Sequence, residues 1–103
     1  MDRVFHALSD PTRRDIVRLV LDTEHSVSEL AERYPMSFAA VQKHVAVLER
    51  AELVQKRRQG REQRVRGDID ALRTVNRLLD QYEAVWRSRI DQMDEILNEE
   101  KSR

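Results

Sequence analysis

The chain has 103 residues, with 19 Lys and Arg against 19 Asp and Glu, so its formal net charge is zero. No apolar run approaches the ~20 residues of a membrane-spanning helix, and the opening "MDRVFHALSD" is too polar for a signal peptide. Cysteine is absent, which excludes disulfides, thiol chemistry and thiolate metal sites. We therefore expect a single cytoplasmic domain over residues 1–103, with no membrane partner.

The first third of the chain carries clear helix signals. Val4, Phe5 and Leu8 predict a short first helix with one apolar face. Asp10 followed by Pro11 predicts the start of a second helix, because Asp is a favoured N-cap and Pro suits the first helical position. The buried stripe expected on this second helix consists of Ile16, Val17, Val20 and Leu21.

Two further helices are predicted close together. Residues 22–25 suggest a polar connection, and Ser26 with Glu29 three positions later forms a capping-box pattern at the start of a third helix. Pro35 would end that helix, and Ser37 can cap the next one. The connection would then be only about three residues, "PMS", which predicts a helix-turn-helix.

The fourth predicted helix, about residues 38–51, has two distinct faces. Its apolar stripe consists of Val41, His44, Val45 and Leu48, with His44 expected at the edge of the core. On the opposite face, Gln42 can pair with adenine and Lys43 with guanine or phosphate. Arg13 and Arg14 would either add a phosphate contact or form internal salt bridges. The residues predicted to face the DNA major groove are Ser37, Phe38, Ala39, Gln42 and Lys43.

Positive charge is concentrated just after this helix. Residues 56–66 contain six basic side chains and one acid. The same stretch has the pattern of two short strands around a tight turn at Gln59-Gly60. A basic hairpin beside a DNA-reading helix would lie along the phosphates, where each contact releases counterions. The predicted backbone or minor-groove contacts are Lys56, Arg58, Arg61 and Arg64.

A long last helix is predicted at about residues 69–99, after Gly67 ends the hairpin and Asp68 caps the helix. Thirty residues would form a rod of about 45 Å, longer than a core of this size can cover. Its apolar stripe therefore needs a partner, most simply a second copy of the chain, although Tyr82 and Trp86 could instead line an effector pocket. The predicted dimer interface consists of Phe5, Leu8, Leu79, Tyr82, Trp86, Ile90, Met93 and Leu97.

The order of elements predicts a mainly α (α+β) fold, a winged helix-turn-helix. Residues 1–67 would form the helix-turn-helix core and a two-stranded wing, and residues 68–103 the dimerisation helix. Residues 36–66 carry a net charge of +5 and residues 68–103 a net charge of −3, so the neutral total hides two opposed regions. The helix-turn-helix and the basic wing predict a homodimer that binds double-stranded DNA. The sequence shows no set of catalytic residues, so we predict that the protein is not an enzyme. The alternative is a protein-interaction module that has lost DNA binding.

Three stretches carry a family resemblance. "FHALSDPTRRDIVRLV", "SVSELAERYPMSFAAVQKHVAVLERAELV" and "REQRVR" resemble the ArsR/SmtB family of bacterial winged-helix repressors. The tail "YEAVWRSRIDQMDEIL" is similar to the SdpR-like autorepressor branch of that family. The resemblance implies a homodimer, built from the first and last helices, that binds palindromic operator DNA and represses transcription.

The chain departs from the family at the metal site. Metal-sensing members carry a Cys-Val-Cys motif or a similar one at the start of the third helix, where this chain has Ser26-Val27-Ser28. Hydroxyls are poor ligands for soft metals, and the last helix has no histidine. We therefore predict no metal and no cofactor. The signal stays open between a small apolar ligand, a sequestering protein and no input.

A second departure lies just past the fourth helix. Family members usually have glycine at the position of Glu52, where a helix end commonly requires a left-handed residue. We expect Glu52 to adopt that conformation in spite of its strain, because Leu53 must still turn into the core.

Overall fold

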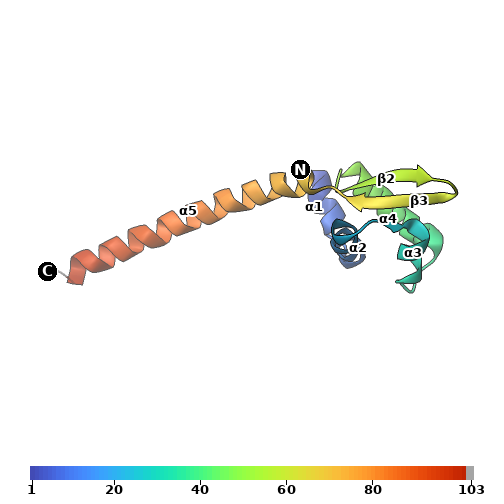
Figure 1. Cartoon of the computed structure of the whole chain (residues 1–103). Helices are drawn as coiled ribbons and strands as arrows, with labels where there is room; N and C mark the ends of the chain where they lie inside the picture. The colour runs from blue at the N-terminus through green and yellow to red at the C-terminus, as the bar shows by residue number, and fades with distance from the viewer. Residues whose placement is uncertain (102–103) are drawn as a thin grey trace.

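Residues 1–101 are the part of the chain that this computed structural model describes. The elements in order are α1 (Asp2–Leu8), α2 (Pro11–Asp22), β1 (His25–Ser26), α3 (Val27–Glu32), α4 (Phe38–Arg50), β2 (Val54–Gln59), β3 (Glu62–Gly67) and α5 (Ile69–Lys101). The first four helices and the sheet form a body from which α5 projects as a rod, so the molecule measures 75 × 25 × 23 Å (Figure 1). Within residues 1–101, no helix is both long and apolar enough to cross a membrane.

The hydrophobic core lies between α1–α4 and the base of the hairpin. Its largest fully buried apolar side chains are Ile16, Leu30, Val41, Val45, Leu48, Leu53, Val54 and Val65. The predicted apolar stripe of α4 is confirmed, with His44 half-buried at its edge. The predicted stripe of α2 is wrong at one position: Leu19 is buried, whereas Leu21 is 40% exposed. The Leu21 side chain instead lies against the end of β3, at Gly67.

All four predicted N-caps are confirmed. In each case a side-chain oxygen accepts a backbone N–H at 2.9–3.1 Å; the capping residues are Asp10, Ser26, Ser37 and Asp68. The N–H of Arg13 holds the pKa of the Asp10 carboxyl below its usual range, and the N–H of Asp70 does the same for Asp68. The start of each of these helices is therefore determined locally.

The connection between α3 and α4 is longer than predicted. Helix α3 ends at Glu32, before Pro35 is reached, so residues 33–37 join the two helices. Tyr34 leaves the helical path, and its hydroxyl donates to the Asp15 carboxylate of α2 at 2.7 Å. This hydrogen bond lowers the pKa of Asp15 and ties the turn of the helix-turn-helix to α2.

The sheet has one strand more than the hairpin. Its order is β1-β3-β2, and the two-residue strand β1 pairs antiparallel with β3, His25 opposite Val65 and Ser26 opposite Arg64. Residues 22–25 were expected to be a connection, and a strand this short leaves no alternating pattern to detect. The predicted turn is also wrong by one residue, because Gln59 pairs with Glu62 and leaves Gly60-Arg61 as the loop. Gly60 has φ +62°, and glycine at the first loop position is typical of a type II′ turn.

Helix α4 ends in a Schellman motif. The Leu53 N–H bonds to the Leu48 carbonyl and the Glu52 N–H to the Glu49 carbonyl, both at 3.0 Å. Glu52 has φ +61°, which confirms the expected left-handed conformation. Leu48 and Leu53 hold the two positions whose apolar side chains usually pack together in this motif, and both are fully buried.

We therefore expect Glu52→Gly to stabilise the fold. Relief of left-handed strain should raise the free energy of unfolding by about 1–2 kcal/mol. The greater freedom of glycine in the unfolded chain should lower it by about 0.4–1 kcal/mol. The net gain in the free energy of unfolding, measured in urea, should be about 0.5–1 kcal/mol. As a control, Lys43→Gly in the middle of helix α4, where Lys43 is exposed, should destabilise by about 1 kcal/mol. Loss of stability in Glu52→Gly would show that side-chain contacts of Glu52 outweigh its backbone strain.

Candidate nucleic-acid interface

The solvent-exposed residues at the start of α4 form the first part of the candidate interface. Ser37 caps the helix. Ala39, Gln42 and Lys43 are turned away from the buried Val41 and Val45, whereas Phe38 is on the side of Val45 and is exposed in the first turn. The structure thus brings the five predicted groove-facing residues together on the first two turns of α4. They are Ser37, Phe38, Ala39, Gln42 and Lys43, all exposed.

The hairpin of β2 and β3 adjoins this helix along one of its two faces. Strand alternation places Val54, Lys56 and Arg58 on the same face of β2. Gln42 of α4 and Lys56 of β2 line a common cavity of about 100 Å³ together with Gln63 of β3. The recognition helix and the core-side face of the wing are therefore neighbours.

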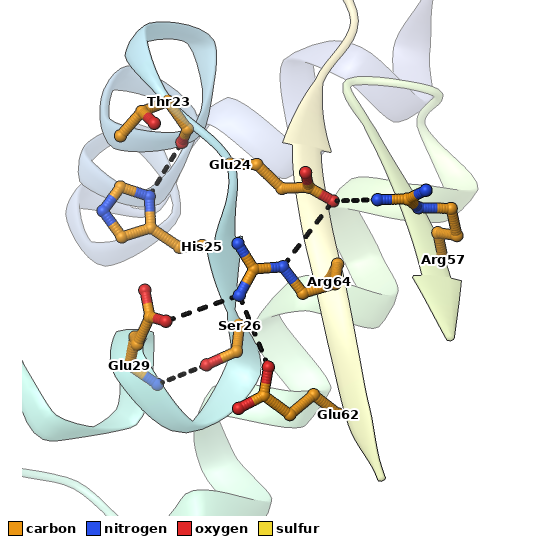
Figure 2. Close-up of polar contacts among 8 residues, drawn as sticks. All are labelled: Thr23, Glu24, His25, Ser26, Glu29, Arg57, Glu62 and Arg64. Atoms are coloured by element: carbon orange, nitrogen blue, oxygen red, sulfur yellow. Dashed lines mark hydrogen bonds and ion pairs between the residues drawn. The ribbon is translucent and has the colours of Figure 1, made fainter. Parts of the chain in front are cut away.

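The wing's basic side chains fall into two groups. Half of them are ion-paired. Lys56 pairs with Glu49 at 3.5 Å. Arg57 pairs with Glu24 at 3.4 Å, and Arg64 pairs with Glu24, Glu29 and Glu62 at 3.4–3.8 Å (Figure 2). By contrast, Arg58 and Arg61 at the hairpin tip and Arg66 at its base are exposed and have no ion pair within residues 1–101; Arg66 donates to the Gln55 side chain at 2.8 Å.

This pairing changes the prediction for the wing. Lys56, Arg58, Arg61 and Arg64 were expected to act alike, yet only Arg58 and Arg61 present free charge. Arg64 lies on the opposite face of the hairpin from Lys56 and Arg58, because its position alternates with theirs. Two of the three carboxylates that hold it, Glu24 and Glu29, are far away in sequence, so counting charges along the wing could not reveal them.

Arg13 and Arg14 donate to backbone carbonyls and not to carboxylates, so the alternative of internal salt bridges is wrong, whereas the phosphate contact stays a prediction. Arg13 donates to the carbonyls of His6 and Ala7 at 3.0 and 2.7 Å, and Arg14 donates to the Leu8 carbonyl at 2.8 Å. Within residues 1–101 neither arginine forms an ion pair. Both instead donate to carbonyl groups in the last turn of α1, where the regular helical hydrogen bonds end; the His6 carbonyl also accepts the Ser9 N–H at 3.1 Å.

The projecting part of α5 leaves an apolar stripe uncovered. Val75 is the one buried residue of the helix between Ile69 and Lys101. The exposed apolar side chains beyond Val75 are Leu79, Tyr82, Val85, Trp86, Ile90, Met93, Ile96 and Leu97 on α5, and Phe5 is exposed on α1. Sequence reasoning missed Val85 and Ile96, which flank the predicted stripe. Leu8 is half-buried and lines an apolar groove of about 470 Å³ between α1 and the start of α5.

Comparison with known proteins identifies this arrangement. A family model described as "Helix-turn-helix domain" matches residues 8–57. The transcriptional repressor SdpR of Bacillus subtilis is 35% identical over 60 residues, which cover 58% of this chain and 67% of SdpR. The structure of an ArsR-like transcriptional regulator from Rhodococcus sp. RHA1 superposes with a TM-score of 0.82 and is 35% identical in sequence. The match covers 94% of this chain and 89% of the regulator. The chain belongs to the ArsR/SmtB family.

Membership of this family confirms the predicted fold and the predicted role in transcription. The ArsR/SmtB chain is a DNA-binding transcriptional regulator with a mainly α winged helix-turn-helix fold, as predicted. A further similar structure is the homodimeric winged helix-turn-helix DNA-binding domain Mb0332 of Mycobacterium bovis. Its sequence is 25% identical, and the match covers 80% of this chain and 77% of Mb0332, with a TM-score of 0.65.

In this ArsR/SmtB chain the serine at the start of α3 has a structural role, as the cap of the helix. Ser26 is buried, and its hydroxyl accepts the Glu29 N–H at 3.0 Å. Within residues 1–101 no three or more His, Asp or Glu side chains cluster in a way that could hold a metal ion.

We therefore expect zinc, nickel, cadmium and arsenite at micromolar levels to leave DNA affinity unchanged. The measurement is a DNA titration with each metal in turn, with a chelator as the reference. Metal-dependent release of DNA, with stoichiometric metal bound per protomer, would contradict this expectation.

Proposed function

We propose that the chain acts as a homodimeric repressor that reads a palindromic operator. The observation that carries this proposal is the combined surface of α4 and the wing tip. Gln42 and Lys43 face solvent on the recognition helix, while Arg58 and Arg61 extend unpaired charge from the neighbouring hairpin. Such a surface suits a major groove and its flanking phosphates.

Each part of this surface would have its own role. The residues assigned to base-edge contacts and close approach in the major groove are Ser37, Phe38, Ala39, Gln42 and Lys43. Arg58 and Arg61 would hold the flanking phosphates or the minor groove, where every contact adds to the salt dependence. Lys56, paired with Glu49 at 3.5 Å, would contribute at the base of the wing.

The dimer would form through α5 and α1. Its interface would consist of Phe5, Leu8, Leu79, Tyr82, Trp86, Ile90, Met93 and Leu97, with Val85 and Ile96 at the margin. The homodimeric state of Mb0332 supports an assembly of two chains. Two recognition helices would then lie about one turn of DNA apart, ~34 Å, which fits a palindrome.

Two alternatives are less well supported. A small apolar ligand could occupy the groove lined by Leu8 and Leu79, but in a dimer the partner protomer would cover this groove. A protein-interaction module without DNA binding would not need free arginines at the wing tip beside an exposed Gln42. The unpaired wing-tip arginines and the exposed Gln42 are both explained by a non-catalytic regulator that binds DNA in the cytoplasm.

A pair of substitutions separates base reading from phosphate binding. Gln42→Ala should relax preference at one base pair of each half-site by about 1–3 kcal/mol, the usual value of a bidentate contact. Arg61→Ala should weaken all duplexes alike and reduce the salt slope by about one per protomer. Competition titrations with single-base operator variants measure the first effect. A uniform loss in Gln42→Ala would show that this residue reads no base.

The proposal as a whole is tested by selecting bound duplexes from a random pool. We expect an inverted repeat whose half-site centres lie about 10–10.5 base pairs apart or a multiple of that. The matched control is Gln42→Ala with Lys43→Ala, which should abolish the enrichment while the protein remains folded. Failure of the wild-type chain to enrich any sequence would count against operator recognition.

A further inference from the structure

Arg64 of β3 lies in a cluster of acidic side chains. Its side chain is only 22% exposed, and Nη1 lies 3.5 Å from Oε1 of Glu29 and 3.4 Å from Oε2 of Glu62. Its Nε is buried without a hydrogen-bond partner, 3.8 Å from Oε1 of Glu24 (Figure 2). A guanidinium this buried depends on the surrounding carboxylates to offset its lost hydration.

A second arginine shares one of these carboxylates. Arg57 of β2 lies directly opposite Arg64 in the hairpin, and like charges in that position repel each other. Oε1 of Glu24 lies 3.4 Å from Nη2 of Arg57, so this single carboxylate bridges both guanidinium groups. The arginine cluster (Glu24, Glu29, Arg57, Glu62 and Arg64) therefore holds three negative and two positive groups.

The arginine cluster connects the wing to the helix-turn-helix. Glu24 immediately precedes β1, and Glu29 lies in the first turn of α3. Arg64 is also the pairing partner of Ser26, whose hydroxyl caps α3. Because β1 has only two residues, its backbone pairing with β3 is a weak attachment, and the ion pairs reinforce it at the same place.

We propose that Arg64 is a positioning residue that fixes the wing relative to the recognition helix and does not bind DNA phosphate. The cluster has an excess of negative charge, so moving the guanidinium onto DNA would leave three carboxylates near the phosphates. Holding the wing in place aims Arg58 and Arg61 at the flanking backbone. This inference rests on the proposed function, because it assigns a role in binding the same DNA.

A positioning role has a distinct energetic signature. If the wing occupies its docking orientation only part of the time, the apparent DNA affinity is multiplied by the fraction of time spent there, while the number of phosphate contacts stays constant. Loss of a phosphate contact instead lowers the slope of log affinity against log salt by about one. Hydrogen exchange of the free protein provides an independent measure, since a loosened wing opens locally without global unfolding.

The test compares Arg64→Gln with Arg61→Gln, the same chemical change at the unpaired wing tip. Exchange rates of backbone amides in β1 and β3 are measured without DNA, with amides of α2 as the internal reference. The salt slope is measured on one duplex for both variants. We expect Arg64→Gln to speed exchange in β1 and β3 by about tenfold and leave α2 unchanged. Its DNA affinity should fall by about threefold or more with the wild-type salt slope.

The control variant should behave in the opposite way. Arg61→Gln should leave exchange unchanged and reduce the slope by about one per protomer. A fall in slope of that size in Arg64→Gln would overturn the proposal, as would unchanged exchange in β1 and β3. If the wild-type chain bound no DNA, the proposed function would fail, whereas the exchange rates would still show whether Arg64 holds the wing.

Discussion

Replacing Trp86 and Ile90 with Asp is expected to turn the dimer into a monomer whose winged-helix body remains folded. Both side chains lie on the projecting part of α5, 59% and 38% exposed, and belong to the uncovered apolar stripe. Burying carboxylates in an apolar interface costs several kcal/mol per ion. Because symmetry places four such groups in every dimer, association should fall by orders of magnitude.

Loss of the dimer should also abolish palindrome recognition. Linking two DNA-binding modules raises overall affinity by about 10²–10⁴-fold, and a monomer forgoes that gain. Sedimentation reports the oligomeric state, circular dichroism the fold, and titration the DNA affinity. The matched control is Ala84→Asp with Ser88→Asp, which adds the same charge on the opposite face of α5 and should leave the dimer intact. A Trp86→Asp, Ile90→Asp protein that still sedimented as a dimer would overturn this interface.

Gly67→Ala is expected to destabilise the fold by about 1–3 kcal/mol, the usual cost of overpacking. A Cβ at this position would lie 2.6 Å from Cδ2 of Leu21 and 2.9 Å from the backbone of the same residue. The side chain can move away, but the backbone atom is held within α2. Gly67 also pairs with the buried Val54, so the displacement would reach the base of the hairpin. Urea unfolding measures the loss.

Two comparisons establish that close packing is the cause. Adding Leu21→Ala should restore part of the stability of Gly67→Ala, because it removes the clash with the leucine side chain and leaves the clash with the backbone. Gly60→Ala should cost about 1–2 kcal/mol for a different reason: its Cβ meets nothing within 4 Å, but φ is +62°. Wild-type stability in Gly67→Ala would contradict the packing of α2 against the end of β3.

The sequence predicts the helices well because their signals are local. The N-cap residues Asp10, Ser26, Ser37 and Asp68 each contact a backbone N–H two or three positions away, so a short window contains the whole interaction. The left-handed Glu52 was expected from the resemblance and the helix end together, and it is confirmed. Spacing also places the recognition face of α4 opposite its core face.

What the sequence could not reveal depends on contacts between distant segments. Strand β1 exists because His25 and Ser26 pair with Arg64 and Val65, and two residues carry no strand pattern of their own. The ion pair of Arg64 with Glu29 is invisible to a count of charge along the wing. The turn at Gly60-Arg61 is set by the register of the whole hairpin, which a glycine locates only to within one residue.

The salt dependence of binding to a random-sequence duplex tests the central claim most directly. With Arg58 and Arg61 contacting phosphate in both protomers, log affinity should fall linearly with log salt, with a slope of about −3 to −4 or steeper. Arg58→Ala with Arg61→Ala should remove most of that dependence while leaving the dimer intact. A wild-type protein whose interaction with duplex DNA was absent, or unaffected by salt, would contradict a winged helix that holds DNA through its wing tips.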